Sequence, residues 1–186
     1  NISLASENKI NPFDLPRSVA GEAKAEDIIR SGVITVKGLV RLMLGDLTHG
    51  EDSIIDRALL ETYAKKDITP DADLSKVEAP IMQDLEDILE GLEGGADLAL
   101  RLRKYTQGTF AGLFNSPTNV KMDNQLVCFS VRDLEDELRP IAIYMVVNYI
   151  WNVVRSELKK RILVIDEAWW LMQHEDSAKF IYALVK

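Results

Sequence analysis

Cysteine and histidine are scarce in this sequence, and their scarcity excludes whole classes of site. One cysteine, Cys128, stands among 186 residues, so no disulfide can form within the chain. Its neighbours Val127 and Phe129 predict a small buried apolar residue rather than a reactive thiol, in a reducing compartment. The two histidines, His49 and His174, belong to no Cys/His pattern with zinc spacing, which excludes a His/Cys metal site.

Basic residues are also fewer than acidic residues in this sequence. The chain has 22 Lys and Arg residues against 30 Asp and Glu residues, a net charge of −8. Because Lys and Arg supply the attraction to phosphate, this balance disfavours non-specific binding of nucleic acid. Residues 1–11 show no secretory signal peptide. The longest apolar stretch, residues 141–154, is shorter than the ~20 residues that a membrane-spanning helix needs.

A phosphate-binding loop is missing as well. Such a loop has the pattern Gly-x-x-x-x-Gly-Lys-Ser/Thr, in which backbone amides and one lysine surround the phosphates. None of the ten glycines is followed by Lys and then Ser or Thr. The sequence therefore excludes an ordinary P-loop nucleotide site built from this chain alone.

The first two thirds of the chain carry helical patterns and no strand pattern. Apolar residues recur at three- and four-residue steps in four segments, and each predicts an amphipathic helix. These segments are residues 23–47, 51–65, 80–92 and 96–105. Gly45 is a plausible stop, and Thr48 with Glu51 matches a capping box that starts the next helix. With a short apolar anchor at 108–119, the pattern predicts an all-α subdomain over residues 23–122.

The last third changes pattern. Residues 125–131 and 162–165 are short apolar runs, which predict strands buried on both faces of a parallel sheet. A helix over about 133–159 joins them, so we expect a βαβ unit with a right-handed crossover. A final helix is expected over about 175–186.

Two acids, Asp166 and Glu167, directly follow the second expected strand. Ligands of open α/β sheets bind at the carboxyl ends of the strands. The arrangement has the form of a Walker B motif, in which Asp166 holds Mg²⁺ through a water and Glu167 orients the water that attacks the γ-phosphate. The alternative is a solvated acidic turn. With no P-loop and only two clear strands, we expect an internal part of a longer protein.

Five sequence blocks, in this order, resemble one family. The blocks are Ile10-Asn11-Pro12-Phe13-Asp14, Glu51-x-x-x-Ile55-Asp56-Arg57-Ala58-x-x-x-x-Tyr63, Pro80-x-x-x-Asp84-Leu85, Gly108-x-x-x-Gly112-Leu113-Phe114-Asn115-x-x-Thr118 and Leu163-Val164-Ile165-Asp166-Glu167-Ala168-Trp169. Their order and spacing resemble the motor region of the TraC/TrbE-type ATPases of conjugation and type IV secretion. That family is part of the wider RecA-like, HerA/FtsK-related group.

The resemblance implies an α/β fold, a partial RecA-like parallel sheet with a large all-α insertion. Residues 1–22 would be a RecA-like segment, 23–122 the insertion, and 123–186 a RecA-like α/β segment with Walker B. The implied activity is ATP hydrolysis with ATP and Mg²⁺ as cofactors, Asp166 at the metal and Glu167 catalytic. Because the P-loop is absent, no nucleotide-binding residue is assigned, and the fragment alone would be inactive.

The resemblance also implies a setting and partners. Such ATPases are cytoplasmic, lie against the inner membrane and dock on secretion-channel proteins there. They act as homo-oligomers, often hexamers. Two alternatives stay open: a non-catalytic helical docking module, and a DNA-translocating motor of the HerA/FtsK kind. The acidic balance disfavours the second, and a nucleic-acid partner is left undecided.

Overall fold

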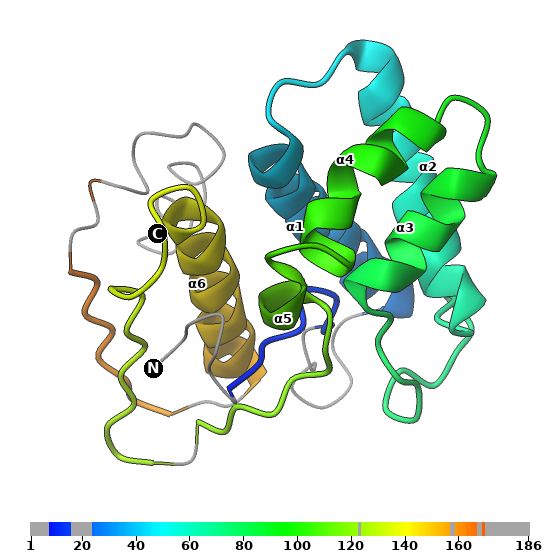
Figure 1. The fold of residues 1–186 in the computed structure, drawn as a ribbon. Helices are drawn as coiled ribbons and strands as arrows, with labels where there is room; N and C mark the ends of the chain where they lie inside the picture. Colours follow the sequence, from blue (N-terminus) through cyan, green and yellow to red (C-terminus); the bar gives the residue numbers. More distant parts are fainter. Residues whose placement is uncertain (1–7, 16–23, 123, 157–158, 167–168, 170–186) are drawn as a thin grey trace.

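The structure is a computed structural model that describes residues 8–15, 24–122, 124–156, 159–166 and 169. These residues form six helices (Figure 1). The helices are α1 (Ala25–Leu44), α2 (His49–Lys65), α3 (Met82–Gly91), α4 (Ala96–Thr106), α5 (Ala111–Phe114) and α6 (Arg139–Ser156). Helices α1 to α5 pack into one bundle, and α6 lies apart from α2 and α3, against α1.

The ends of the first two helices confirm the local sequence signals. Gly45 follows α1 with a φ of 76°, a left-handed conformation that glycine adopts at little cost. At the start of α2, the Glu51 N–H donates to Thr48 Oγ1 at 3.2 Å, and the Thr48 N–H donates to Glu51 Oε2 at 2.8 Å. Both halves of the capping box are therefore formed, so α2 begins where its own sequence specifies.

The bundle core consists of the apolar stripes that the periodicity predicts. The fully buried side chains include Leu39, Ile55, Leu59, Leu85, Leu89, Leu98, Tyr105 and Phe114. Ion pairs also join helices at the surface: Lys37 Nζ on α1 lies 2.8 Å from a carboxylate oxygen of both Asp52 and Asp56 on α2. Apolar burial and these interhelical pairs together fix the order of the helices in the bundle.

Helix α6 approaches α1 closely because Gly38 has no side chain. A Cβ atom on Gly38 would clash with the hydroxyl oxygen of Tyr144 on α6. That hydroxyl donates to the Thr35 carbonyl oxygen on α1 at 3.1 Å. Eight residues of α6 are buried, as its apolar sequence predicts, although the helix begins at Arg139 rather than near Asp133.

The predicted partial parallel sheet is wrong. Within the described ranges no strand forms, and both segments expected to be strands have no regular secondary structure. Their side chains are not buried either: Leu126 is 86% exposed, Ile162 is 93% exposed and Val164 is 82% exposed. A strand exists only when a second strand pairs with its backbone, and an apolar run cannot supply that partner. For the residues that the structure describes, the α/β fold class is therefore replaced by an all-helical one.

The segment before α6 covers that helix instead of pairing with another strand. The Phe129 ring packs edge-on against the Tyr149 ring at a centroid distance of 6.3 Å, and the Tyr149 hydroxyl donates to the Val120 carbonyl at 2.7 Å. Cys128 is exposed, so its predicted burial is wrong too. The helix expected over 175–186 lies outside the described residues. No described helix has both the length and the apolar content to cross a membrane.

Candidate functional site

Only one member of the predicted Walker B pair can be placed. Asp166 is an exposed residue in a turn, directly after the extended segment 161–165, and Glu167 lies outside the described residues. Among the described residues no cluster of three or more His, Cys, Asp or Glu side chains has the geometry to hold a metal. A Mg²⁺ ion bound with nucleotide takes most of its ligands from water and phosphate, so one accessible carboxylate suits it. The roles of Asp166 and Glu167 stay predictions.

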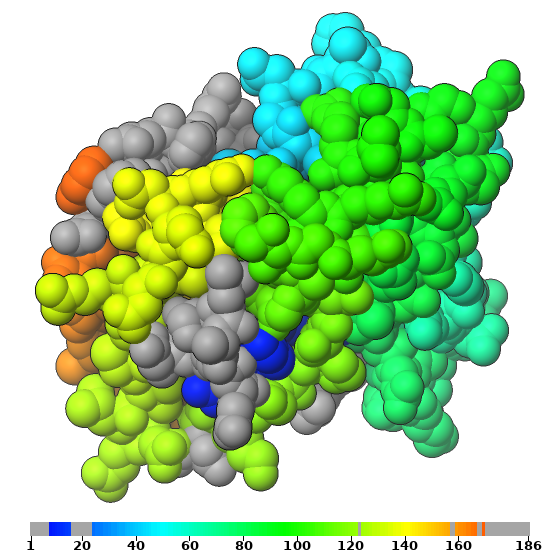
Figure 2. Space-filling view, in the orientation of Figure 1, coloured from blue at the N-terminus to red at the C-terminus, as the bar shows by residue number. Residues whose placement is uncertain are grey.

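The first of the five sequence blocks passes between the helical bundle and α6. In Figure 1 the blue segment, residues 8–15, runs from beside α6 past α5, and Figure 2 shows it reaching this face of the molecule in small areas only. Asn11 is 3% exposed. Its Nδ2 donates to the Pro80 carbonyl at 2.8 Å, and its backbone N–H donates to Thr118 Oγ1 at 2.6 Å. One asparagine thus ties three distant segments together.

Phe13 anchors the same block to α2. Its ring is fully buried and meets the Tyr63 ring edge-on at a centroid distance of 5.7 Å. The Tyr63 hydroxyl donates to the Phe13 carbonyl oxygen at 3.2 Å. Burial raises the pKa of Tyr63 far above its usual range, and the nearby charge of Asp14 raises it further. Tyr63 therefore stays a neutral hydrogen-bond donor and has no acid–base role.

Asn115, in the fourth block, holds two helix ends at this junction. Its Oδ1 accepts from the Gln83 N–H at the start of α3 at 2.9 Å, and its Nδ2 donates to the Thr106 carbonyl at the end of α4 at 3.1 Å. These are backbone groups that the helices themselves leave unpaired. The first four blocks of the resemblance therefore meet in space, and their side chains fix backbone positions rather than forming a catalytic cluster.

A buried carboxylate that the sequence analysis missed lies inside the bundle. Glu86 is 1% exposed. Its oxygens accept from Arg103 Nε at 3.1 Å, from Gln107 Nε2 at 2.8 Å and from the Thr106 hydroxyl. The sequence contained a signal for this burial, because Glu86 directly follows Leu85 and stands on the apolar stripe of α3. With three donors, the charge is compensated, which indicates a structural role.

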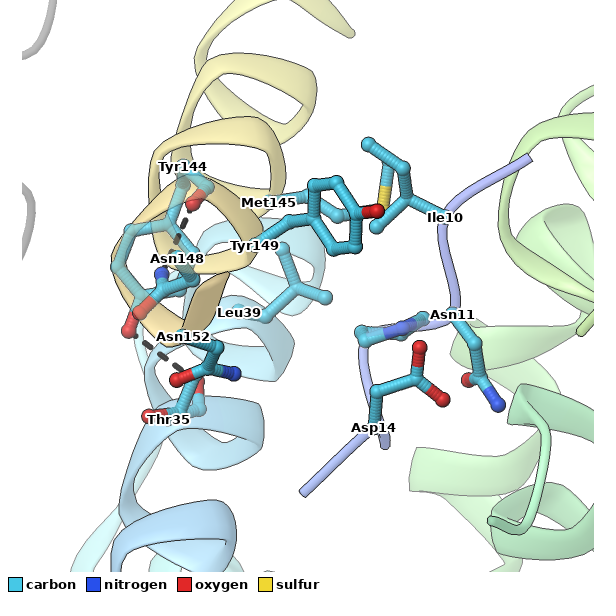
Figure 3. A pocket seen from close by; sticks show the side chains of 11 residues that line it. Ile10, Asn11, Asp14, Thr35, Leu39, Tyr144, Met145, Asn148, Tyr149 and Asn152 are labelled. Carbon is cyan, nitrogen blue, oxygen red and sulfur yellow. Dashed lines mark hydrogen bonds between the residues drawn. The ribbon is translucent and has the colours of Figure 1, made fainter. Parts of the chain in front are cut away.

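A small pocket lies where residues 10–14 meet α1 and α6 (Figure 3). Its volume of about 20 Å³ is enough for roughly one water molecule. Its polar lining includes Thr35 on α1 and Asn148 and Asn152 on α6. A nucleotide does not fit in this space, so the pocket is not the ATP site that the resemblance implies.

Comparison with known proteins agrees with the resemblance at a coarse level. No family model and no curated protein matches this chain. Among solved structures, the chain is similar to VirB4 of Thermoanaerobacter pseudethanolicus, with a TM-score of 0.76 and 26% sequence identity. The similarity covers 94% of this chain and 72% of the VirB4 chain. Similarity over nearly the whole chain supports a relationship to VirB4- and TraC-like proteins.

Proposed function

We propose that this chain is part of an ATPase that powers type IV secretion or conjugative transfer. The observation that carries the proposal is the similarity to VirB4 across 94% of the chain at a TM-score of 0.76. The order of the five sequence blocks supports the same family independently of the coordinates. The junction around Asn11 adds a physical reason for that order, because side chains of the first four blocks hold one another in place.

The proposed chemistry is Mg²⁺-dependent hydrolysis of ATP. Asp166 would hold the Mg²⁺ ion, and Glu167 would orient the water for attack on the γ-phosphate. Mg²⁺, when bound, neutralises charge that develops on the phosphate oxygens. The exposure of Asp166 supports its role, since the carboxylate is accessible to a metal–nucleotide complex. The sequence lacks a P-loop, so we propose that the phosphates are held by a P-loop elsewhere in a longer polypeptide.

The proposed organisation has three parts: residues 1–22, a helical subdomain over 23–122, and residues 123–186 with the acidic pair. The helical subdomain is proposed as the docking part, on homo-oligomer neighbours or on channel proteins of the inner membrane. Ion pairs between neighbouring helices support it as a rigid unit, for example Lys37 with Asp52 and Arg103 with Glu86. The protein is proposed to act in the cytoplasm, against the inner membrane.

The decisive experiment is Glu167→Gln in the polypeptide that carries this chain together with a P-loop. We expect kcat for ATP hydrolysis to fall by roughly 10²–10⁴-fold while nucleotide affinity is retained, because the amide cannot take a proton from water. Glu93→Gln, at an exposed position in the α3–α4 turn, is the matched control and leaves kcat unchanged.

An unchanged kcat in Glu167→Gln would refute the catalytic role assigned to Glu167. The docking-module alternative predicts a different result. The unaltered polypeptide would then show no ATPase activity, and binding to a channel protein would survive replacement of both Asp166 and Glu167. Measuring ATP turnover and partner binding on the same variants separates the two functions.

A further inference from the structure

Two asparagines interrupt the otherwise apolar helix α6, and they share one face. Asn148 and Asn152 are four residues apart, one helical turn, so their side chains project in the same direction. Asn148 is only 8% exposed. Its Nδ2 donates to the Tyr144 carbonyl at 2.8 Å, and among the described contacts nothing donates to its Oδ1. This oxygen is not among the fully buried polar atoms that lack a partner, so water can reach it. An amide oxygen that no protein group donates to takes its hydrogen bond from water.

The pocket of Figure 3 collects further hydrogen-bonding groups that have no protein partner. Thr35 on α1 uses its carbonyl to accept from Tyr144, whereas its hydroxyl takes part in none of the described hydrogen bonds. The side-chain amide of Asn152 likewise takes part in none of the described hydrogen bonds. Figure 3 shows Asn152 next to Thr35, with Asn148 one turn away along α6. An acceptor, a hydroxyl and an amide therefore face one small space.

We infer that one water molecule binds in this pocket and bridges α6 to α1. The pocket volume of about 20 Å³ suits a single water. The water donates its two hydrogens to Asn148 Oδ1 and Asn152 Oδ1 and accepts from the Thr35 hydroxyl. Three hydrogen bonds are the usual number for a buried water.

The rest of the lining favours water over a cation. Apolar side chains of Ile10, Leu39 and Met145 line the pocket as well. A hard cation takes six or more oxygen ligands, which such walls cannot supply. Asp14 is the one charged residue among those that line the pocket, and one carboxylate falls far short of such a ligand set.

A double-mutant cycle on the full chain tests the bridge. Thr35→Val and Asn148→Leu remove the two partners with nearly unchanged volume, and no direct hydrogen bond joins these two side chains. If a water links them, removing either one breaks the bridge, so the second change adds little. We expect the unfolding equilibrium constants to be non-additive by roughly five- to tenfold, measured by urea unfolding. Additive effects would overturn the inference.

Two controls keep the test decisive. Thr35→Val combined with Asn124→Ala, an exposed change outside the pocket lining, should give additive effects. Exchange of sodium for potassium or choline at constant ionic strength should leave the stability of the unaltered chain unchanged; a dependence on the cation would assign the site to a metal ion and overturn the water. If the variants fail to fold, a high-resolution crystal structure of the unaltered chain decides, because absent density beside Asn148 Oδ1 refutes the proposal.

Discussion

Replacing Asn11 with alanine tests whether the first sequence block holds the bundle together. The asparagine side chain makes two hydrogen bonds in a buried setting. Its Nδ2 donates to the Pro80 carbonyl at 2.8 Å, and its Oδ1 accepts from the Phe13 N–H at 3.1 Å. Alanine removes both and leaves those backbone groups without their partners, whereas the bond from the residue 11 N–H to Thr118 is retained.

The expected loss follows from this count. Removing one partner of a buried hydrogen bond costs about 1–3 kcal/mol for the group left unpaired. Asn11→Ala leaves two such backbone groups, so it should reduce the free energy of unfolding by roughly 2–6 kcal/mol. With a urea m-value of about 2 kcal/mol/M, the midpoint of unfolding moves down by roughly 1–3 M at constant m.

The assay is urea unfolding of the full chain followed by far-UV circular dichroism. Asn124→Ala, an exposed loop change, is the control and should stay within about 0.5 kcal/mol of the unaltered chain. Asn11→Asp is a second arm: it keeps the acceptor for the Phe13 N–H but turns an oxygen toward the Pro80 carbonyl, so it should also destabilise. A loss below about 0.5 kcal/mol in Asn11→Ala would show that the junction contributes little.

Three further predictions use other parts of the molecule. Gly38→Ala forces a methyl group against the Tyr144 hydroxyl and should cost about 1–3 kcal/mol in chemical unfolding, while adding Tyr144→Phe should recover part of the loss; no recovery would contradict the contact. Thr106→Val deletes a donor to the buried Glu86 carboxylate and should cost about 1.5–3 kcal/mol, whereas a neutral effect in thermal unfolding would show that the remaining donors suffice. The hydrogen bond from the Thr48 backbone N–H lowers the pKa of Glu51 below its usual 4.5. The stability that this carboxylate contributes is therefore present above pH 4.5 and is lost as the pH falls through the lowered pKa. Glu51→Gln should flatten that part of the curve of stability against pH, and an unchanged curve would exclude the effect.

The proposed ATPase site illustrates how far sequence patterns extend. Position 166 directly after an extended apolar run was predictable, because the run and the acids are contiguous in the chain. Whether that run is a strand was not, because Ile162, Leu163 and Val164 are exposed and have no strand partner in the described part of the chain. The partners of Asn11 were equally hidden. They come from residues 80 and 118, and no local pattern connects those positions.

By itself, the sequence determined the features that depend on near neighbours. Three- and four-residue spacing located the bundle helices, Gly45 ended α1, and the Thr48–Glu51 pair began α2, because each interaction spans one helical turn. Only the tertiary structure decided that the expected sheet does not form and that the first four blocks meet at Asn11. Strand pairing and burial of a polar side chain both need partners from distant parts of the chain, and only the folded chain brings those partners within hydrogen-bonding distance.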